Sequence, residues 1–267
     1  MSHVVTKEQA LKERHYYKLP NGTDTWISSC VGMNSVERRA KNMPPRAPEA
    51  FPPPLEPIAF LVEQGANSSI PGHYHQADQF QVFVSGEGKF GIKPIEGMTV
   101  HYAMAFTPYA PIHAEGTNIE YYTLRNGWDP GARWMPEHKE ALKGKTKSYR
   151  HGLGLIPALI GDTDGPKNID GIKTHAVVPA EADGLGATLF QTTSAQVISG
   201  PAPDTGRGQY WMVLRGACTI NGEDAFERSL IFFAPTDKAP VVQSSSTGVA
   251  ICVCSSLSVK AHRITRS

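Results

Sequence analysis

Two histidines, His73 and His75, alternate in a segment that continues into a run of polar and apolar residues. On an extended strand alternate side chains share a face, so both imidazoles point the same way. Gln79 has the same parity if the strand carries no bulge. Two imidazoles that project together beside a third polar ligand can hold a divalent transition metal. The competing interpretation is a pair of exposed histidines that alternate by chance, because histidine is also an ordinary surface residue.

The spacing resembles the first motif of the cupin superfamily, G-x5-H-x-H-x3-4-E-x6-G. Both histidines match, Gln79 stands where the family has glutamate, and Gly86 follows after six residues. The second cupin motif, P-x-G-x2-H, is similar to residues 108–113, with Ala110 in place of glycine. This resemblance implies a small antiparallel barrel in which both motifs converge on one metal.

Carried over residue by residue, the resemblance implies that His73, His75 and His113 are metal ligands. Gln79 would complete the shell or hold a bound water, although a neutral amide is a weaker ligand than a carboxylate. Three imidazoles on one side of a metal leave positions open for water, substrate or dioxygen. Families with this ligand set include cysteine dioxygenase and the β-diketone-cleaving dioxygenases, which favours Fe(II). Zinc, manganese or nickel are the other metals we consider.

The sequence therefore leads to two functional hypotheses. The first is an Fe(II) dioxygenase that acts on a small aromatic or dicarbonyl compound. The alternative is a non-redox metal cupin, either an isomerase, a lyase or a hydrolase, or a protein that binds a small ligand. A pocket with many aromatic residues suits a small, partly apolar organic molecule. The candidates for catalytic or substrate contacts are His101, Tyr109 and Arg125, with a plain strand histidine and core packing as their competing interpretations.

The elements that must position these residues are short strands broken by Gly, Pro and Asn. Over residues 58–128 the pattern fits one all-β barrel. Residues 86–91 match G-x-G-x-x-G, but the dinucleotide interpretation needs a helix next, and Pro94 follows in a β-like run. We interpret that match as a β-turn.

The second half of the chain repeats the first. Residues 209–216 align with residues 79–86, and a period this long indicates a duplicated domain. We therefore expect a second cupin barrel over residues 177–256. Its counterparts of the three histidines are Pro203, Thr205 and Pro240, none of which is a metal ligand. The second barrel should be degenerate and free of metal, closing an edge, capping the pocket or forming a homodimer surface.

The remaining segments are expected to connect or flank the barrels. Residues 1–57 read as an N-terminal extension with a Pro-rich connector, in which Thr6 and Gln9 could form a capping box and residues 24–31 a strand. Residues 129–176 are a connector, and residues 257–267 a C-terminal tail.

Composition excludes several other classes. The 26 basic and 25 acidic residues leave no electrostatic case for nucleic acid. The apolar runs are too short to cross a bilayer, and the N-terminus has no signal-peptide core. Cys252 and Cys254 alternate on an apolar run, which favours a buried strand face over a disulfide or zinc site. We expect a cytoplasmic protein without a membrane partner.

Overall fold

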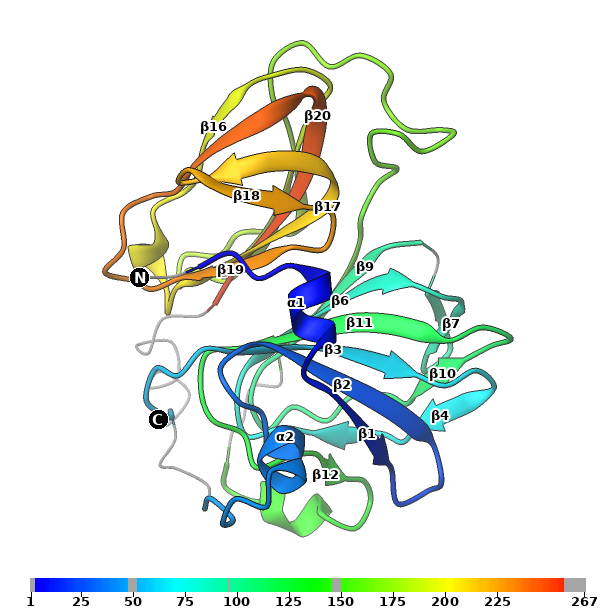
Figure 1. The fold of residues 1–267 in the computed structure, drawn as a ribbon. Coiled ribbons are helices and arrows are strands. Elements are labelled where there is room, and N and C mark those ends of the chain that lie inside the picture. Colours follow the sequence, from blue (N-terminus) through cyan, green and yellow to red (C-terminus); the bar gives the residue numbers. More distant parts are fainter. Residues whose placement is uncertain (1–2, 48–51, 96, 146–149, 257–267) are drawn as a thin grey trace. The chain divides into compact units, whose positions relative to one another are not determined.

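The computed structural model describes residues 3–47, 52–95, 97–145 and 150–256. The predicted tail over residues 257–267 lies outside the described residues, as does part of the Pro-rich connector. The described residues divide into two compact units, one within residues 10–155 and one of residues 3–9 with 156–256. Both are antiparallel β structures, which confirms the predicted all-β class (Figure 1). Within the described residues, no helix is long and apolar enough to span a membrane.

The first unit is built on a seven-stranded antiparallel sheet. In sheet order its strands are β1 (Arg14–Lys18), β2 (Asp24–Val31), β3 (Ile58–Gln64), β11 (Ile119–Arg125), β6 (Gln79–Ser85), β9 (Thr99–Ala103) and β13 (His151–Leu155). A four-stranded sheet consists of β4 (Ser68–Ile70), β10 (Ile112–Ala114), β7 (Gly88–Phe90) and β8 (Lys93–Ile95). A short ladder pairs β12 (Arg133–Trp134) with β5 (His73–Tyr74).

The N-terminal residues belong to this barrel more closely than the sequence suggested. The predicted strand over residues 24–31 is present as β2, and it pairs with β3 at the point where the barrel was expected to begin. Residues 14–31 therefore extend the barrel sheet, instead of forming an extension apart from it. The reason is the apolar face of β2, on which Ile27 joins the core cluster that contains Phe60 and Val62 of β3.

Three short helices accompany the strands: α1 (Lys7–Leu11), α2 (Ser35–Ala40) and the 3-10 helix η1 (Lys139–Leu142). The predicted capping box is present at α1, where the Thr6 N–H donates to Gln9 Oε1 and the Gln9 N–H donates to Thr6 Oγ1. Asn34 caps α2 by accepting from two backbone N–H groups of the first turn.

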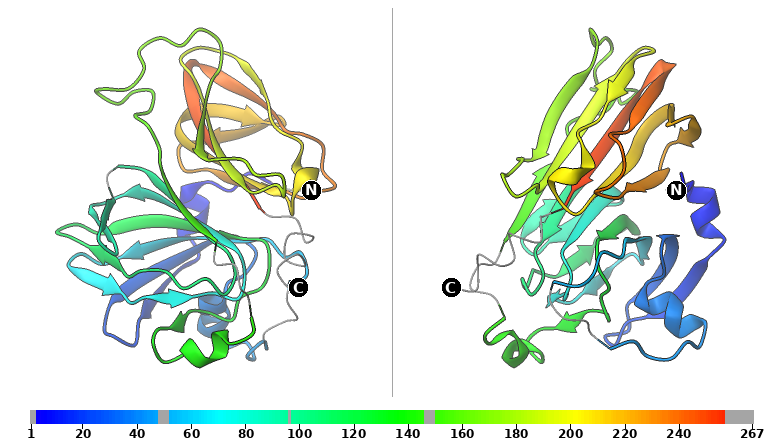
Figure 2. Two further views of the ribbon diagram at one scale, coloured as in Figure 1. Left: turned by 180° about the vertical axis from the view of Figure 1, so that it is seen from behind. Right: turned by 90° about the vertical axis from the view of Figure 1, so that its left-hand side faces the viewer.

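The second unit is a single seven-stranded antiparallel sheet. Its main path runs through β14 (Lys173–Val178), β15 (Gly186–Thr192), β20 (Val241–Ser255), β17 (Gln209–Ile220) and β18 (Glu223–Phe226). Two more strands, β16 (Val197–Ser199) and β19 (Leu230–Phe233), pair with β20 and β17, and Pro203–Thr205 forms the 3-10 helix η2. Figure 2 shows the long strands β17 and β20 running through this unit.

The predicted repeat is visible in the strand registers of the two units. Gln79 of β6 pairs with Ala103 and Arg125, whereas Gln209 of β17 pairs with Phe233 and Ser255. Each partner in the second unit lies 130 residues after its counterpart, the same offset that separates the two glutamines. The aromatic pair Phe80–Tyr102 and its counterpart Tyr210–Phe232 have ring centroids 4.9 and 4.8 Å apart, both at 50°. The duplication predicted from the sequence is therefore reproduced in three adjacent strands.

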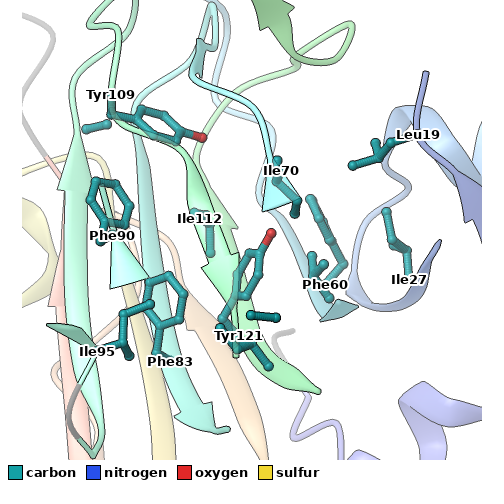
Figure 3. Packing of buried hydrophobic residues seen from close by; sticks show 14 of the residues in the cluster. Leu19, Ile27, Phe60, Ile70, Phe83, Phe90, Ile95, Tyr109, Ile112 and Tyr121 are labelled. Atoms are coloured by element: carbon teal, nitrogen blue, oxygen red, sulfur yellow. The ribbon is translucent and has the colours of Figure 1, made fainter. Parts of the chain in front are cut away.

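The interior of the first barrel changes from polar to apolar along three rows of inward-facing side chains. Cross-strand neighbours on β6, β9 and β11 face the same side of the sheet. The row at the polar end contains Gln79 with Arg125, and the next contains Gln81 with His101 and Thr123. The third row contains Phe83 with Tyr121 and Thr99. Phe83 and Tyr121 belong to the apolar cluster drawn in Figure 3. The polar rows position the candidate site.

Candidate metal and ligand site

His73 and His75 lie together at the polar end of the first barrel. His73 belongs to β5 and His75 directly follows it, and the two ring centroids are 5.0 Å apart at 86°. Both side chains are buried, with 4% and 9% of their surface exposed. The alternation predicted from the sequence therefore brings both imidazoles to one place.

Each imidazole is oriented through its Nδ1 atom. His73 Nδ1 donates to the Pro71 carbonyl at 2.7 Å, and His75 Nδ1 donates to Asp129 Oδ1 at 2.8 Å. With Nδ1 protonated in this way, Nε2 of each ring carries the lone pair. A carbonyl or carboxylate that holds Nδ1 is the usual outer contact of a metal-binding histidine.

Both rings are also in the neutral form that binds metals. Burial, followed by the neighbouring His75, lowers the pKa of His73 to about 3. Burial and the Arg125 guanidinium lower the pKa of His75 as well. Neither imidazole therefore needs to lose a proton near neutral pH before its Nε2 binds a ligand.

The Tyr109 hydroxyl is a third polar group beside His73 and His75. Its Oη donates to His73 Nε2 at 2.7 Å and accepts from Gln79 Nε2 at 2.8 Å. The backbone of Tyr109 forms a β-bridge with His73, which places the two residues directly opposite each other. Figure 3 shows the Tyr109 hydroxyl pointing into the space at the centre of the barrel cluster. Of the three candidate contact residues, Tyr109 is thus one that the structure brings to the histidine pair.

Gln79 and Arg125 complete the cluster on the neighbouring strands. Gln79 Oε1 accepts from Arg125 Nη2 at 2.9 Å and from Nε at 3.1 Å. The oxygen through which Gln79 was expected to approach a metal therefore already faces a guanidinium. Gln79 and Arg125 are cross-strand neighbours on β6 and β11, so strand pairing fixes this contact.

Asp129 is a site residue that the sequence reasoning missed. Its side chain accepts hydrogen bonds from His75 Nδ1 and from the backbone N–H groups of Gln76 (2.7 Å) and Gly131 (2.8 Å), and Arg125 Nη1 lies 3.3 Å away. Burial alone would raise the pKa of Asp129, but His75, Arg125 and these hydrogen bonds together lower it. The carboxylate therefore stays charged and balances Arg125. Its only sequence signal was an Asp-Pro-Gly turn.

His113 does not join the pair. It lies on β10 between Ile112 and Ala114, both of which belong to the barrel core, while His113 itself is half-buried. Alternation along the strand directs its side chain to the face opposite the core. Within the described residues, the only three His, Cys, Asp or Glu side chains with ligand atoms mutually within 4.8 Å are Glu13, His15 and Glu37. The three-histidine arrangement implied by the cupin resemblance is therefore not assembled in this structure.

The acidic group at Glu13 and Glu37 already has a cation. Lys41 Nζ lies 2.6 Å from Glu37 Oε1 and 3.1 Å from Glu13 Oε2. We interpret this group as an ion-pair cluster between β1 and α2.

His101 lies in the second polar row of the barrel interior, one row beyond Gln79 and Arg125. It lies opposite Gln81 on β9, is fully buried, and its Nδ1 donates to Gln81 Oε1 at 2.8 Å. Gln81 in turn lines a cavity of about 180 Å³ beside the histidine pair. Other side chains around this cavity are Tyr17, Phe60, Tyr121, Thr123, Arg125 and Trp134.

The residues at this site supply part of the ligand set that a transition metal needs. Two neutral imidazoles with fixed Nδ1 atoms are a suitable pair of nitrogen donors for a transition metal. The nearest further donor is Tyr109 Oη, because His113 lies outside the cluster and Gln79 Oε1 is bound to Arg125. A metal on His73 Nε2 would replace the hydrogen bond that Tyr109 Oη donates to this atom. The Tyr109 hydroxyl would then lie next to the metal. Asp129 supplies the negative charge that offsets Arg125 near such a cation.

Solved structures resemble the fold of the whole chain. No family model matches the sequence, and no curated protein matches it. A candidate dioxygenase from Nostoc punctiforme superposes with a TM-score of 0.61 at 10% identity, over 95% of this chain and 82% of that one. The architecture shared with this and the following structures is two cupin barrels in one chain. The chain has the bicupin fold.

Two further bicupin structures show which ligands this fold holds elsewhere. Salicylate 1,2-dioxygenase from Pseudoaminobacter salicylatoxidans, solved with gentisate, has a TM-score of 0.53 at 9% identity, covering 95% of this chain and 80% of that one. The bacterial pirin YhhW from Escherichia coli, solved with nickel(II), has a TM-score of 0.52 at 9% identity, covering 96% and 100%. At this identity the likeness concerns the fold.

Proposed function

We propose that the first barrel binds one divalent transition metal through His73 and His75, with Tyr109 as the adjacent oxygen donor. The observation that carries this proposal is that both buried rings are held through Nδ1, which leaves the lone pair of each on Nε2, with the Tyr109 hydroxyl as the group that a metal on His73 would displace. The second barrel has Pro203 and Thr205 at the corresponding positions and is proposed to bind no metal.

The activity that suits this site is oxidation of a small, partly aromatic molecule, with Fe(II) as the metal and dioxygen as the oxidant. When bound, such a metal supplies Lewis-acid or redox chemistry that the protein side chains lack. The cavity beside the pair is large enough for a single aromatic ring and carries both aromatic and polar walls. Arg125 and Gln81 would orient the polar groups of the molecule, and Tyr109 would hold or pass a proton at Oη. The dioxygenases among the solved bicupins support this choice.

A metal-free binding protein is the second candidate, and one observation favours it. The buried Arg125 guanidinium contacts Gln79 and lies 3.1 Å from His75 Nδ1, so the part of its charge that Asp129 does not offset would repel a cation and attract an anion. A zinc, manganese or nickel enzyme without redox chemistry is distinguished from the iron dioxygenase by the same experiment. The homodimer and the cytoplasmic location stay predictions.

The test is the metal content of purified protein, followed by oxygen uptake with a panel of catechols and diketones. We expect close to one metal per chain in the wild type and a strong loss in His73→Ala and in His75→Ala, because each change removes one of two nitrogen donors. His113→Ala is the matched control and should keep its metal. Full metal content in His73→Ala, or loss of metal in His113→Ala, would contradict the proposed ligands. A metal-free wild type that still binds small anions would establish the second candidate.

A further inference from the structure

A second cavity of about 250 Å³ lies at the edge of the first barrel, apart from the one beside the histidine pair. Phe90, Tyr109 and Leu153 form much of its apolar lining, and His101 and His151 are its imidazoles. The rings of Phe90 and Tyr109 stack with centroids 5.8 Å apart at 27°. Figure 3 shows the two side chains near each other. An engineered apolar cavity of about 150 Å³ holds benzene, so this space is sufficient for one substituted ring.

His101 gives the cavity one specific polar atom. Its side chain is fully buried, and Nδ1–H donates to Gln81, which leaves the lone pair on Nε2. No protein atom in the described structure makes a hydrogen bond to this Nε2. Buried polar atoms are nearly always paired, so an unpaired acceptor on a residue that lines a cavity points to a donor that comes from a ligand. The ring centroids of Phe90 and Tyr109 lie 4.3 and 5.1 Å from that of His101.

We propose that this cavity binds a small phenol, whose hydroxyl donates to His101 Nε2 while its ring packs against Phe90 and Tyr109. A metal ion fits less well, because the second imidazole, His151, is exposed and its ring centroid is 6.4 Å from that of His101. A neutral acceptor surrounded by aromatic rings instead selects a flat molecule with one donor. The proposal is independent of the metal proposed for His73 and His75.

The experiment compares phenol with toluene, which has nearly the same shape but no donor. Binding is followed on the full chain by NMR of protein with nitrogen-15-labelled histidine. We expect phenol to bind about three- to tenfold more tightly than toluene, the factor that one net hydrogen bond supplies. Phenol should also shift the His101 Nε2 resonance, and toluene should leave it nearly unchanged.

His101→Phe removes the acceptor and keeps an aromatic ring, so its preference for phenol should vanish. His113→Phe makes the same chemical change outside the core and should keep the preference. The wild-type nitrogen shift tests the contact even if His101→Phe does not fold. Equal binding of phenol and toluene by the wild type, or phenol shifts at His73 and His75 without one at His101, would overturn the proposal. So would Zn²⁺ at equimolar concentration shifting His101 and His151 together while phenol shifts neither.

Discussion

Replacing Asp129 by asparagine tests whether this carboxylate holds the polar end of the barrel together. The side chain is 1% exposed and contacts His75, Arg125 and two backbone N–H groups. Asparagine keeps the size and one acceptor oxygen. It removes the negative charge and turns one oxygen into an amide nitrogen that cannot accept from a backbone N–H. The change therefore removes the carboxylate charge beside the guanidinium of Arg125, which is itself 5% exposed.

The expected cost is about 3 kcal/mol in the free energy of unfolding. Removing one partner of a buried ion pair costs about 3–5 kcal/mol, and we take the lower limit because the closest approach of the two charged groups is 3.3 Å. The hydrogen bond from His75 Nδ1 can survive on the remaining oxygen. If an uncompensated charge is the cause, adding Arg125→Met to Asp129→Asn should recover part of the loss, since both charges are then absent.

The difference in the free energy of unfolding between Asp129→Asn and wild type should also change with pH, and it should become smaller in acid. A carboxyl whose folded pKa is lowered stabilises the fold fully above its unfolded pKa, which is about 3.9, and loses this contribution as the pH falls through the folded pKa. The difference should therefore stay constant between about pH 8 and 5 and shrink only below about pH 4.

Urea unfolding, followed by circular dichroism and tryptophan fluorescence, measures both quantities. Glu87→Gln is the matched control, because it also removes one carboxylate from the first barrel, but at an exposed position. Its effect should stay within about 0.5 kcal/mol. A cost below about 1 kcal/mol for Asp129→Asn at pH 7, or a difference from wild type that grows below pH 4, would refute this account of the site.

Two further predictions concern the barrel strands and the second unit. Gly88→Ala should destabilise the protein by roughly 2 kcal/mol, because the new methyl carbon would lie 1.9 Å from the His113 carbonyl oxygen, whereas Gly152→Ala meets no atom within 4 Å and should cost little in the same unfolding assay. The double variant His73→Ala/His75→Ala should contain no tightly bound metal by elemental analysis; a full equivalent left in that variant would place a metal elsewhere, with the second barrel the first region to inspect.

Most of the fold could be predicted because β structure follows local patterns. Short strand-like runs, ended by Gly, Pro and Asn, indicated the strands of the first barrel. The offset of 130 residues between Gln79 and Gln209 was enough to find the duplication, since strand pairing carries the same offset to the neighbouring strands. The role of Asp129 could not be found in this way. Its contact with His75 spans 54 residues and depends on where the chain turns after β11.

The position of the third polar group shows most clearly why sequence spacing was insufficient. Counting along the second motif selects His113, but the strand partner of His73 is Tyr109, and Ile112 pairs with Ile70 further along. Between these two pairs lie Pro71 and Gly72 on one segment and Ala110 and Pro111 on the other.

Proline cannot donate to a ladder, so the regular pairing and its alternation are interrupted at this point on both segments. Tyr109 and Ile112 consequently both face the interior although they are three positions apart, and His113 is turned away. A histidine at the motif position therefore identifies a ligand only when the strand keeps its alternation up to that residue. Here a tyrosine, and not His113, lies beside His73. The motif spacing predicts that His113→Ala loses its metal, whereas the observed strand pairing predicts that this variant keeps it, so its metal content distinguishes the two.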